Sequence, residues 1–98
     1  MIEWPAVSVV IGSTTTRVVC PLVPHIRHAT GFVVGVTLAP DAAAVLRVPV
    51  AIRQGRVSVV EIPSAAIRNQ FPRGGLCWLT LRDVTGALVA RGRLTLTP

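Results

Sequence analysis

Carboxylates are the first side chains to consider for acid–base chemistry, and this sequence of 98 residues has four, Glu3, Asp41, Glu61 and Asp83. A general acid–base pair needs two titratable groups held together at the reacting bond. The sequence instead spreads its acids over the N-terminal segment, two turns and a strand end. Neither a Gly-x-Ser-x-Gly motif nor a glycine-rich phosphate or dinucleotide loop occurs. These residues predict a protein that is not an enzyme.

Two cysteines and two histidines, Cys20, Cys77, His25 and His28, have the ligand types of a tetrahedral zinc site. Structural zinc sites usually take two ligands from Cys-x-x-Cys or a similarly short motif. No such motif is present, and Cys77 stands alone on its predicted strand. We therefore expect no metal ion and no cofactor, with both histidines in a loop after Pro24.

All ten basic residues are arginine, and they give the chain a net charge of +6. Arginine binds phosphate and other anions through paired hydrogen bonds, so one interpretation is an anion-binding surface. The other is the codon usage of a GC-rich genome, which favours Arg, Ala, Val, Gly and Pro together. Aromatic residues that could stack on bases are few, and only Trp78 is expected on a strand face beside arginines. A small basic nucleic-acid-binding module is therefore the second interpretation, after a surface for protein contacts.

Hydrophobic residues make up 51% of the chain and charged residues only 14%, against about 25% charged in an average soluble domain. The two longest stretches without a charge, Trp4–Thr16 and His28–Pro40, have 13 residues each. A membrane-spanning helix needs about 18 or more apolar residues, so we expect no membrane segment. One domain over residues 1–98 is expected, with surplus apolar surface that contacts copies of itself or another chain. The N-terminus lacks the features of a secretion signal, which indicates synthesis and retention in the cytoplasm until assembly.

Segments rich in Val, Ile, Leu and Thr alternate with turn residues, which predicts an all-β fold. The predicted strands are Ala6–Ile11, Thr15–Leu22, Gly31–Leu38, Val45–Ile52, Arg56–Ile62, Leu76–Arg82 and Leu88–Leu96. A short helical segment is predicted over Pro63–Gln70, with Ser64 as its N-cap. The expected architecture is an immunoglobulin-like β-sandwich of about seven antiparallel strands, with a small barrel as the alternative.

Turn residues predict three tight connections, at Gly12–Thr14, Gln54–Gly55 and Asp83–Gly86. Strand alternation assigns the side chains that face the core. In the third and fourth strands the inward set is Phe32, Val34, Val36, Leu38, Leu46, Val48, Val50 and Ile52. Arg47, Pro49 and Arg53 point outward. Pro49 has no amide hydrogen to donate to a sheet ladder, which indicates an edge strand.

The last two strands allow a prediction of register. Their apolar positions all face inward only if paired residue numbers sum to an odd value, as for Leu81 with Ala90. This register places Trp78 opposite Arg93 on the outer face as a cation–π pair. The candidate contact residues on that face are Trp78, Arg82, Arg91 and Arg93.

Cys20 and Cys77 fall on the second and sixth predicted strands, which are bridged in many immunoglobulin domains, and both are assigned inward. The core tryptophan usual on the third strand of such domains is absent, and Phe32 is its nearest substitute. A cytoplasmic origin favours thiols. Two alternatives stay open: a disulfide between the two cysteines, or two small buried hydrophobic side chains.

The C-terminal half carries an ordered series of motifs over Arg56–Thr97. A strand ends in Ile62-Pro63, a short helical segment follows, and Pro72-Arg73-Gly74 leads into a strand that contains Trp78. An Asp-x-x-Gly turn and a closing strand with Gly92 at its centre complete the series. This order resembles the β-sandwich domains of tailed-bacteriophage virion proteins, such as baseplate upper proteins and fibre-anchoring proteins.

The resemblance implies a non-enzymatic structural protein, present in many copies in a virion and held by contacts with other virion proteins or with itself. An exterior capsid decoration or a tail- or fibre-attachment component is the expected position. Residues 1–5 are a candidate N-terminal arm in which Trp4, ahead of Pro5, docks on a neighbouring subunit. The alternative is that this segment packs on its own domain.

Overall fold

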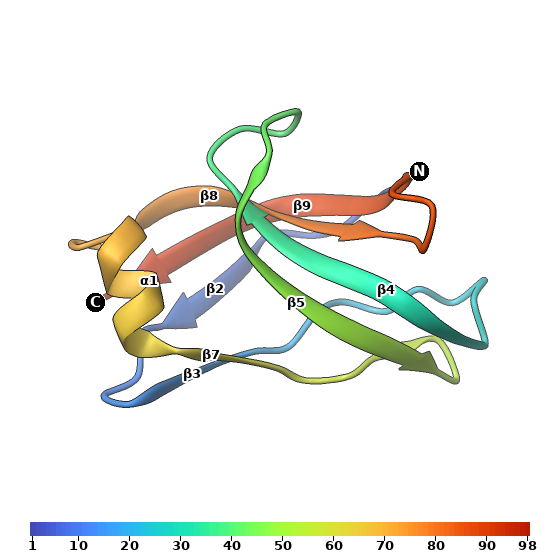
Figure 1. The fold of residues 1–98 in the computed structure, drawn as a ribbon, viewed down its shortest axis with the longest axis horizontal. Coiled ribbons are helices and arrows are strands. Elements are labelled where there is room, and N and C mark those ends of the chain that lie inside the picture. Colours follow the sequence, from blue (N-terminus) through green and yellow to red (C-terminus); the bar gives the residue numbers. More distant parts are fainter.

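Nine strands and one seven-residue helix build the chain, and the computed structural model describes all 98 residues (Figure 1). The elements are β1 Ile2–Glu3, β2 Val7–Val10, β3 Thr15–Val18, β4 His28–Thr37, β5 Ala44–Arg53, β6 Arg56–Val57, β7 Val60–Pro63, α1 Ser64–Gln70, β8 Gly75–Arg82 and β9 Leu88–Thr97. The predicted all-β class is confirmed. The single helix is too short to cross a membrane.

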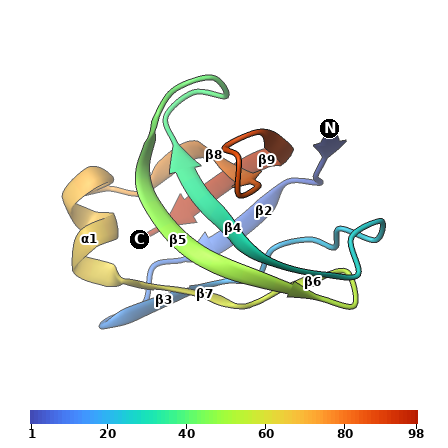
Figure 2. The same cartoon turned by 45° about the vertical axis from the view of Figure 1, so that its right-hand side comes forward.

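Two sheets enclose one core. The larger has the strand order β1-β9-β8-β4-β5-β6, with β2 also paired to β9, and the smaller consists of β3 and β7. Figure 2 shows the long β4–β5 hairpin bending across the molecule above β3 and β7. Apolar side chains from both sheets form one cluster of 22 buried residues. Fully buried members from the small sheet are Val18 and Val60, and from the large sheet Leu79, Leu81 and Leu94.

The N-terminal strands pair in an unexpected way. Both β1 and β2 run parallel to β9, with Ile2 beside Ala90 and Val7 beside Leu94. The prediction of an entirely antiparallel sheet is therefore wrong here, and Gly12–Thr14 does not close a hairpin because β3 leaves β2 to pair with β7. Pairing with β9 buries the inward side chain of Val9, which is 8% exposed.

The β4 and β5 strands follow the predicted alternation except at one end. Phe32, Val34 and Val36 are buried as predicted, but Leu38 is 60% exposed, so its assignment to the core is wrong. The register shifts after Val36, the strand ends at Thr37, and the Thr37 hydroxyl donates to the carbonyl of Ala39 at 2.7 Å. This turn directs the following residue away from the core.

The prediction that Pro49 lies on an edge strand is confirmed. β5 pairs with β4 along its length, whereas its other side pairs with β6 only at Ile52 and Arg53. The predicted Gln54–Gly55 turn is also present, with φ values of 53° and 73°. Such positive values at both central residues match the right-handed twist of a hairpin.

The predicted fifth strand is divided into β6 and β7. The Ser58 amide donates to the Ala51 carbonyl at 2.9 Å, and the Ser58 hydroxyl accepts from the Ala51 amide at 3.2 Å. The Ser58 hydroxyl therefore accepts a hydrogen bond that a backbone carbonyl would accept in a regular β-ladder. After this interruption the chain changes sheet and continues as β7.

The predicted helix is present, but Ser64 does not cap it. Pro63 occupies the N-cap position, and no side chain donates or accepts there. The Ser64 hydroxyl is fully buried and lies 2.8 Å from that of Thr16 on β3. A buried hydroxyl needs a hydrogen-bond partner, and this pair supplies one to both residues. Ser64 therefore joins the helix to the small sheet.

The β8–β9 register is the one predicted. Leu81 lies opposite Ala90, and Trp78 lies opposite Arg93. The inward residues Leu81, Ala90 and Leu94 are each 0% exposed. Because side chains alternate along a strand, the same register fixes which residues lie on the outer face.

Candidate functional site

Trp78 lies on the outer face of the large sheet, between two arginines of the neighbouring strand. The guanidinium carbon of Arg93, directly opposite, is 5.6 Å from the centroid of the Trp78 ring, and that of Arg91 is 6.0 Å from it. A cation within about 6 Å of an aromatic centroid is attracted by the negative face of the ring. The predicted pair with Arg93 is therefore present, and Arg91 joins it.

Strand β1 adds a carboxylate to this group. Glu3 pairs with Arg91 in the parallel ladder, and its Oε1 accepts a hydrogen bond from Arg91 Nε at 3.1 Å. The Glu3 side chain is 63% exposed, so this ion pair contributes little to stability. The ion pair instead matters for geometry, because it holds the Arg91 side chain beside Trp78. Arg93 has no carboxylate partner and stays exposed.

Arg82 lies on the same face, further along β8, and is held by the turn that follows it. Its Nη1 donates to the carbonyl of Gly86 at 2.8 Å. Within the turn, Asp83 Oδ1 accepts hydrogen bonds from the Thr85 hydroxyl at 2.6 Å and the Ala87 amide at 3.0 Å. The Thr85 hydroxyl lowers the pKa of Asp83, and the backbone donors lower it further. The turn is therefore well ordered, and it positions Arg82.

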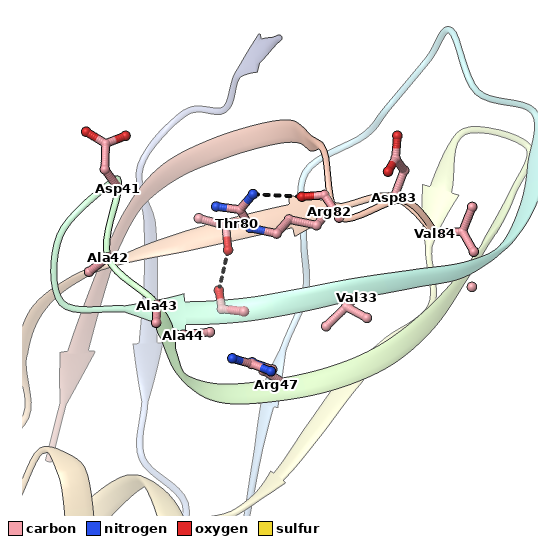
Figure 3. Close-up of a pocket in the computed structure, with 13 residues that line it drawn as sticks. Val33, Asp41, Ala42, Ala43, Ala44, Arg47, Thr80, Arg82, Asp83 and Val84 are labelled. Carbon is pink, nitrogen blue, oxygen red and sulfur yellow. Dashed lines mark hydrogen bonds between the residues drawn. The ribbon is translucent and has the colours of Figure 1, made fainter.

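A hollow of about 480 Å³ opens beside Arg82 (Figure 3). Its floor is formed by small residues of three adjacent strands, Gly35, Ala44 and Thr80. Arg47 from β5 and Arg82 from β8 also line it. The β4–β5 loop forms one wall and the β8–β9 turn forms another.

Gly35 keeps the floor of this hollow flat. The Thr80 hydroxyl donates to the Gly35 carbonyl at 3.3 Å. A Cβ atom at Gly35 would lie 2.9 Å from the Thr80 Oγ1 and 3.0 Å from the Ala44 Cβ. Any side chain there would push these neighbours apart, so the close approach of the strands requires glycine at this position.

Trp4 occupies a different place from the one predicted. It is 6% exposed, its indole Nε1 donates to the carbonyl of Leu22 at 3.2 Å, and its amide donates to the carbonyl of Arg91 at 2.7 Å. Gly92 makes room for it, since a Cβ at Gly92 would lie 2.8 Å from the Trp4 Cβ. The expectation of an arm that offers Trp4 to a neighbouring subunit is therefore wrong, and residues 1–5 pack on their own domain.

Cys20 and Cys77 are both free and buried. Burial raises the pKa of Cys20 to about 12 and that of Cys77 to about 11. The Cys77 thiol donates to the carbonyl of Leu94 at 3.5 Å. Of the two alternatives for this pair, the structure therefore has the buried thiols and not the disulfide.

The structure brings Trp78, Arg91 and Arg93 together and places Arg82 on the same face beside the hollow. Sequence reasoning did not identify Arg47 as part of this surface, although its outward direction in an edge strand was predicted.

No group of three or more His, Cys, Asp or Glu side chains that could hold a metal ion is present. Comparisons with protein-family models, curated proteins and solved structures find no match for this chain.

Proposed function

We propose that the chain is a non-enzymatic structural protein of a tailed-phage or phage-like particle, located in the virion as an exterior capsid decoration or a tail- or fibre-attachment component. The sequence resemblance over Arg56–Thr97 supports this function. The observation that carries the mode of action is the position of the partly exposed Trp78 between two arginines on the outer face of the large sheet. Tryptophan and arginine are the residues most enriched at the energetic centres of protein interfaces.

The outer face of the large sheet is the surface proposed for contact. It includes six exposed or partly exposed outward residues of β5, β8 and β9, namely Arg47, Leu76, Trp78, Arg82, Arg91 and Arg93. Leu76 is 73% exposed on this face, and Trp78 is partly exposed. Apolar side chains gathered among polar ones on an open surface support a role in association.

We also infer that the fold is an immunoglobulin-like sandwich of the variable type. In that topology the larger sheet carries the strands G, F, C, C′ and C″ in sequence across the sheet, and B and E belong to the other. The order β9-β8-β4-β5-β6 and the pair β3-β7 correspond to these two sets. Cys77 on β8 and Cys20 just after β3 then fall near the positions that many immunoglobulin domains bridge.

A second candidate function is a small basic nucleic-acid-binding module. Trp78 beside Arg91 and Arg93 supports it, because an aromatic ring between cations can stack on an unpaired base. A single such ring is a small platform, since proteins that bind single strands stack successive bases on several aromatics. The experiment below separates the two candidates.

The test measures the mass of the purified protein by light scattering at low and moderate salt, with and without a short single-stranded oligonucleotide. A discrete homo-oligomer, or an aggregation-prone monomer indifferent to the oligonucleotide, supports assembly through protein contacts. A monomer that gains mass with the oligonucleotide and loses it as salt rises contradicts the assembly function and supports the second candidate.

The variant Trp78→Ala tests the surface itself. We expect it to reduce self-association or incorporation into a particle while the midpoint of thermal unfolding changes little, because Trp78 lies outside the core. Val19→Ala is the control, since Val19 is 67% exposed and follows β3 of the small sheet, away from the hollow and from Trp78. Normal assembly together with a lowered unfolding midpoint would mean that Trp78 serves stability and not contact.

A further inference from the structure

The hollow on the outer face is lined by two arginines, Arg47 and Arg82, that form no ion pair, although Asp41 and Asp83 lie on its rim. Only Arg17 and Arg91 of the ten arginines form ion pairs, with Glu61 and Glu3. Asp83 is held by its own turn. Arg47 forms no ion pair, and Arg82 bonds only the neutral carbonyl of Gly86.

The register places these two arginines around one point of the sheet. Arg47 on β5 lies opposite Gly35, and Arg82 on β8 lies opposite Val33, so they flank β4 from its two sides. Figure 3 shows their guanidinium groups on the two sides of β4, with Thr80 beside that of Arg82. Between them Gly35 carries no side chain. A group that enters the hollow there reaches donors from two strands.

We propose that this hollow binds the side-chain carboxylate of an acidic residue in a partner polypeptide. The inference rests on the proposed function and adds to it the chemistry of the partner. The guanidinium group presents N–H donors in a planar fork that matches a carboxylate. A hollow of about 480 Å³ is within the usual range of ligand pockets, about 300–1,000 Å³.

The rim of the hollow favours a polypeptide over a nucleic acid. Asp41 in the β4–β5 loop and Asp83 in the β8–β9 turn both line it. A phosphodiester strand carries one negative charge for every nucleotide, so it would meet these carboxylates at both ends of the hollow. A peptide with a single carboxylate directed at the arginines avoids that repulsion.

A second copy of the chain is a poor source of the carboxylate. With Glu3 and Glu61 in ion pairs and Asp83 held by its turn, Asp41 is the only acid without a partner. Each copy also has a net charge of +6, so electrostatic attraction does not favour a second copy as the occupant of the hollow. Charge complementarity therefore favours a different, acidic protein.

The test uses a fluorescein-labelled octapeptide with an amidated C-terminus and one central glutamate among glycines, with binding followed by fluorescence anisotropy. The same peptide with glutamine in place of glutamate controls for the carboxylate, and an eight-nucleotide thymidine strand is the competing anion. We expect the glutamate peptide to bind more tightly than both. Equal or tighter binding of the oligonucleotide would overturn the proposal and support the nucleic-acid candidate.

Variants then locate the site. Arg47→Gln should weaken binding of the glutamate peptide by about tenfold or more, because a charged hydrogen-bonding partner is lost. Arg56→Gln on β6 makes the same change of charge away from the hollow and should weaken binding by far less. Asp41→Asn should strengthen binding, since it removes a negative charge from the rim. Equal weakening by Arg47→Gln and Arg56→Gln would show attraction by net charge alone and would overturn the proposal.

Arg82 needs a second form of variant because it also holds its turn. Arg82→Lys keeps the positive charge and a donor for Gly86 but loses the planar fork. We expect weaker peptide binding with an unchanged unfolding midpoint. Peptide binding lost in Trp78→Ala but kept in Arg47→Gln and Arg82→Lys would reject the hollow while leaving the proposed contact face in place. If none of these variants changes binding, both the hollow and the contact face are rejected.

Discussion

The two faces of β8 differ in composition and in surroundings. On the inner face Cys77, Leu79 and Leu81 are each no more than 3% exposed, within the single core. On the outer face Leu76 is 73% exposed, and Trp78 and Arg82 are partly exposed. From Cys77 onward, every second residue of β8 thus belongs to the core, whereas of the residues that face outward only Thr80 is buried. Substitutions on the two faces should therefore have separable effects.

The largest effect is expected at Trp4, which reaches the core from the N-terminal segment. Trp4→Ala should lower the free energy of unfolding by about 3–5 kcal/mol, because it removes a large buried side chain and leaves a cavity. Urea denaturation followed by circular dichroism measures this change. Were residues 1–5 a free arm, the variant would unfold at the wild-type urea concentration.

Two leucines of β8, one on each face, give the most direct comparison of the effects on stability. Leu81→Ala should lower the free energy of unfolding by about 2–5 kcal/mol, since Leu81 is 0% exposed. Leu76→Ala makes the same chemical change on the outer face and should stay within about 0.5 kcal/mol of the wild type. The same urea titration measures both variants. Similar losses in the two would mean that something covers the outer face in solution.

The smallest effect concerns the two buried thiols, whose ionisation makes stability depend on pH only above pH 9.0. Burial raises the folded-state pKa values of Cys20 and Cys77 to about 12 and about 11, above the ordinary thiol value of 9.0. The folded state therefore holds these protons more tightly than the unfolded state. The resulting stabilisation is complete below pH 9.0 and is lost as the pH rises through 11 and 12.

The reactivity of the thiols checks this prediction. At pH 8, Ellman's reagent should react slowly with the native protein and rapidly with two thiols per chain in concentrated urea. Fast reaction of the native protein would show that the core opens at these positions. A count below two in urea would show that the cysteines are bridged.

Sequence reasoning was most successful where partners are close along the chain. The β8–β9 register followed from the alternation of apolar residues, because a hairpin has few ways to bury both sets, and it led to the Trp78–Arg93 pair. The N-terminal strands were predicted less well. Gly12–Thr14 has the composition of a hairpin turn, but the partner of β2 is β9, and no local signal marks so distant a pairing.

The hollow could not be predicted for a related reason. It depends on the registers of β4 with β5 and of β4 with β8, which place Arg47, Gly35 and Thr80 in one row. Alternation predicts which face of its strand each residue lies on. It does not predict that the three residues form a row, because alternation alone does not align separate strands. The burial of Trp4 could not be predicted from the sequence either, because it depends on the absence of a side chain at the distant Gly92.

The parallel pairing of β1 and β2 with β9 has a consequence for how the protein forms during translation. Glu3 and Arg91 are separated by 88 positions, and β9 lies between the N-terminal strands and β8. During translation β9, the partner of β2, emerges only after the long segment that separates the two strands has been made. Until then the segment from Val7 to Ile11 lacks its partner strand, so the complete fold forms only after β9 has been made. Such long-range pairing slows folding and exposes the nascent chain to aggregation, so efficient production should depend on chaperones that bind its first strands.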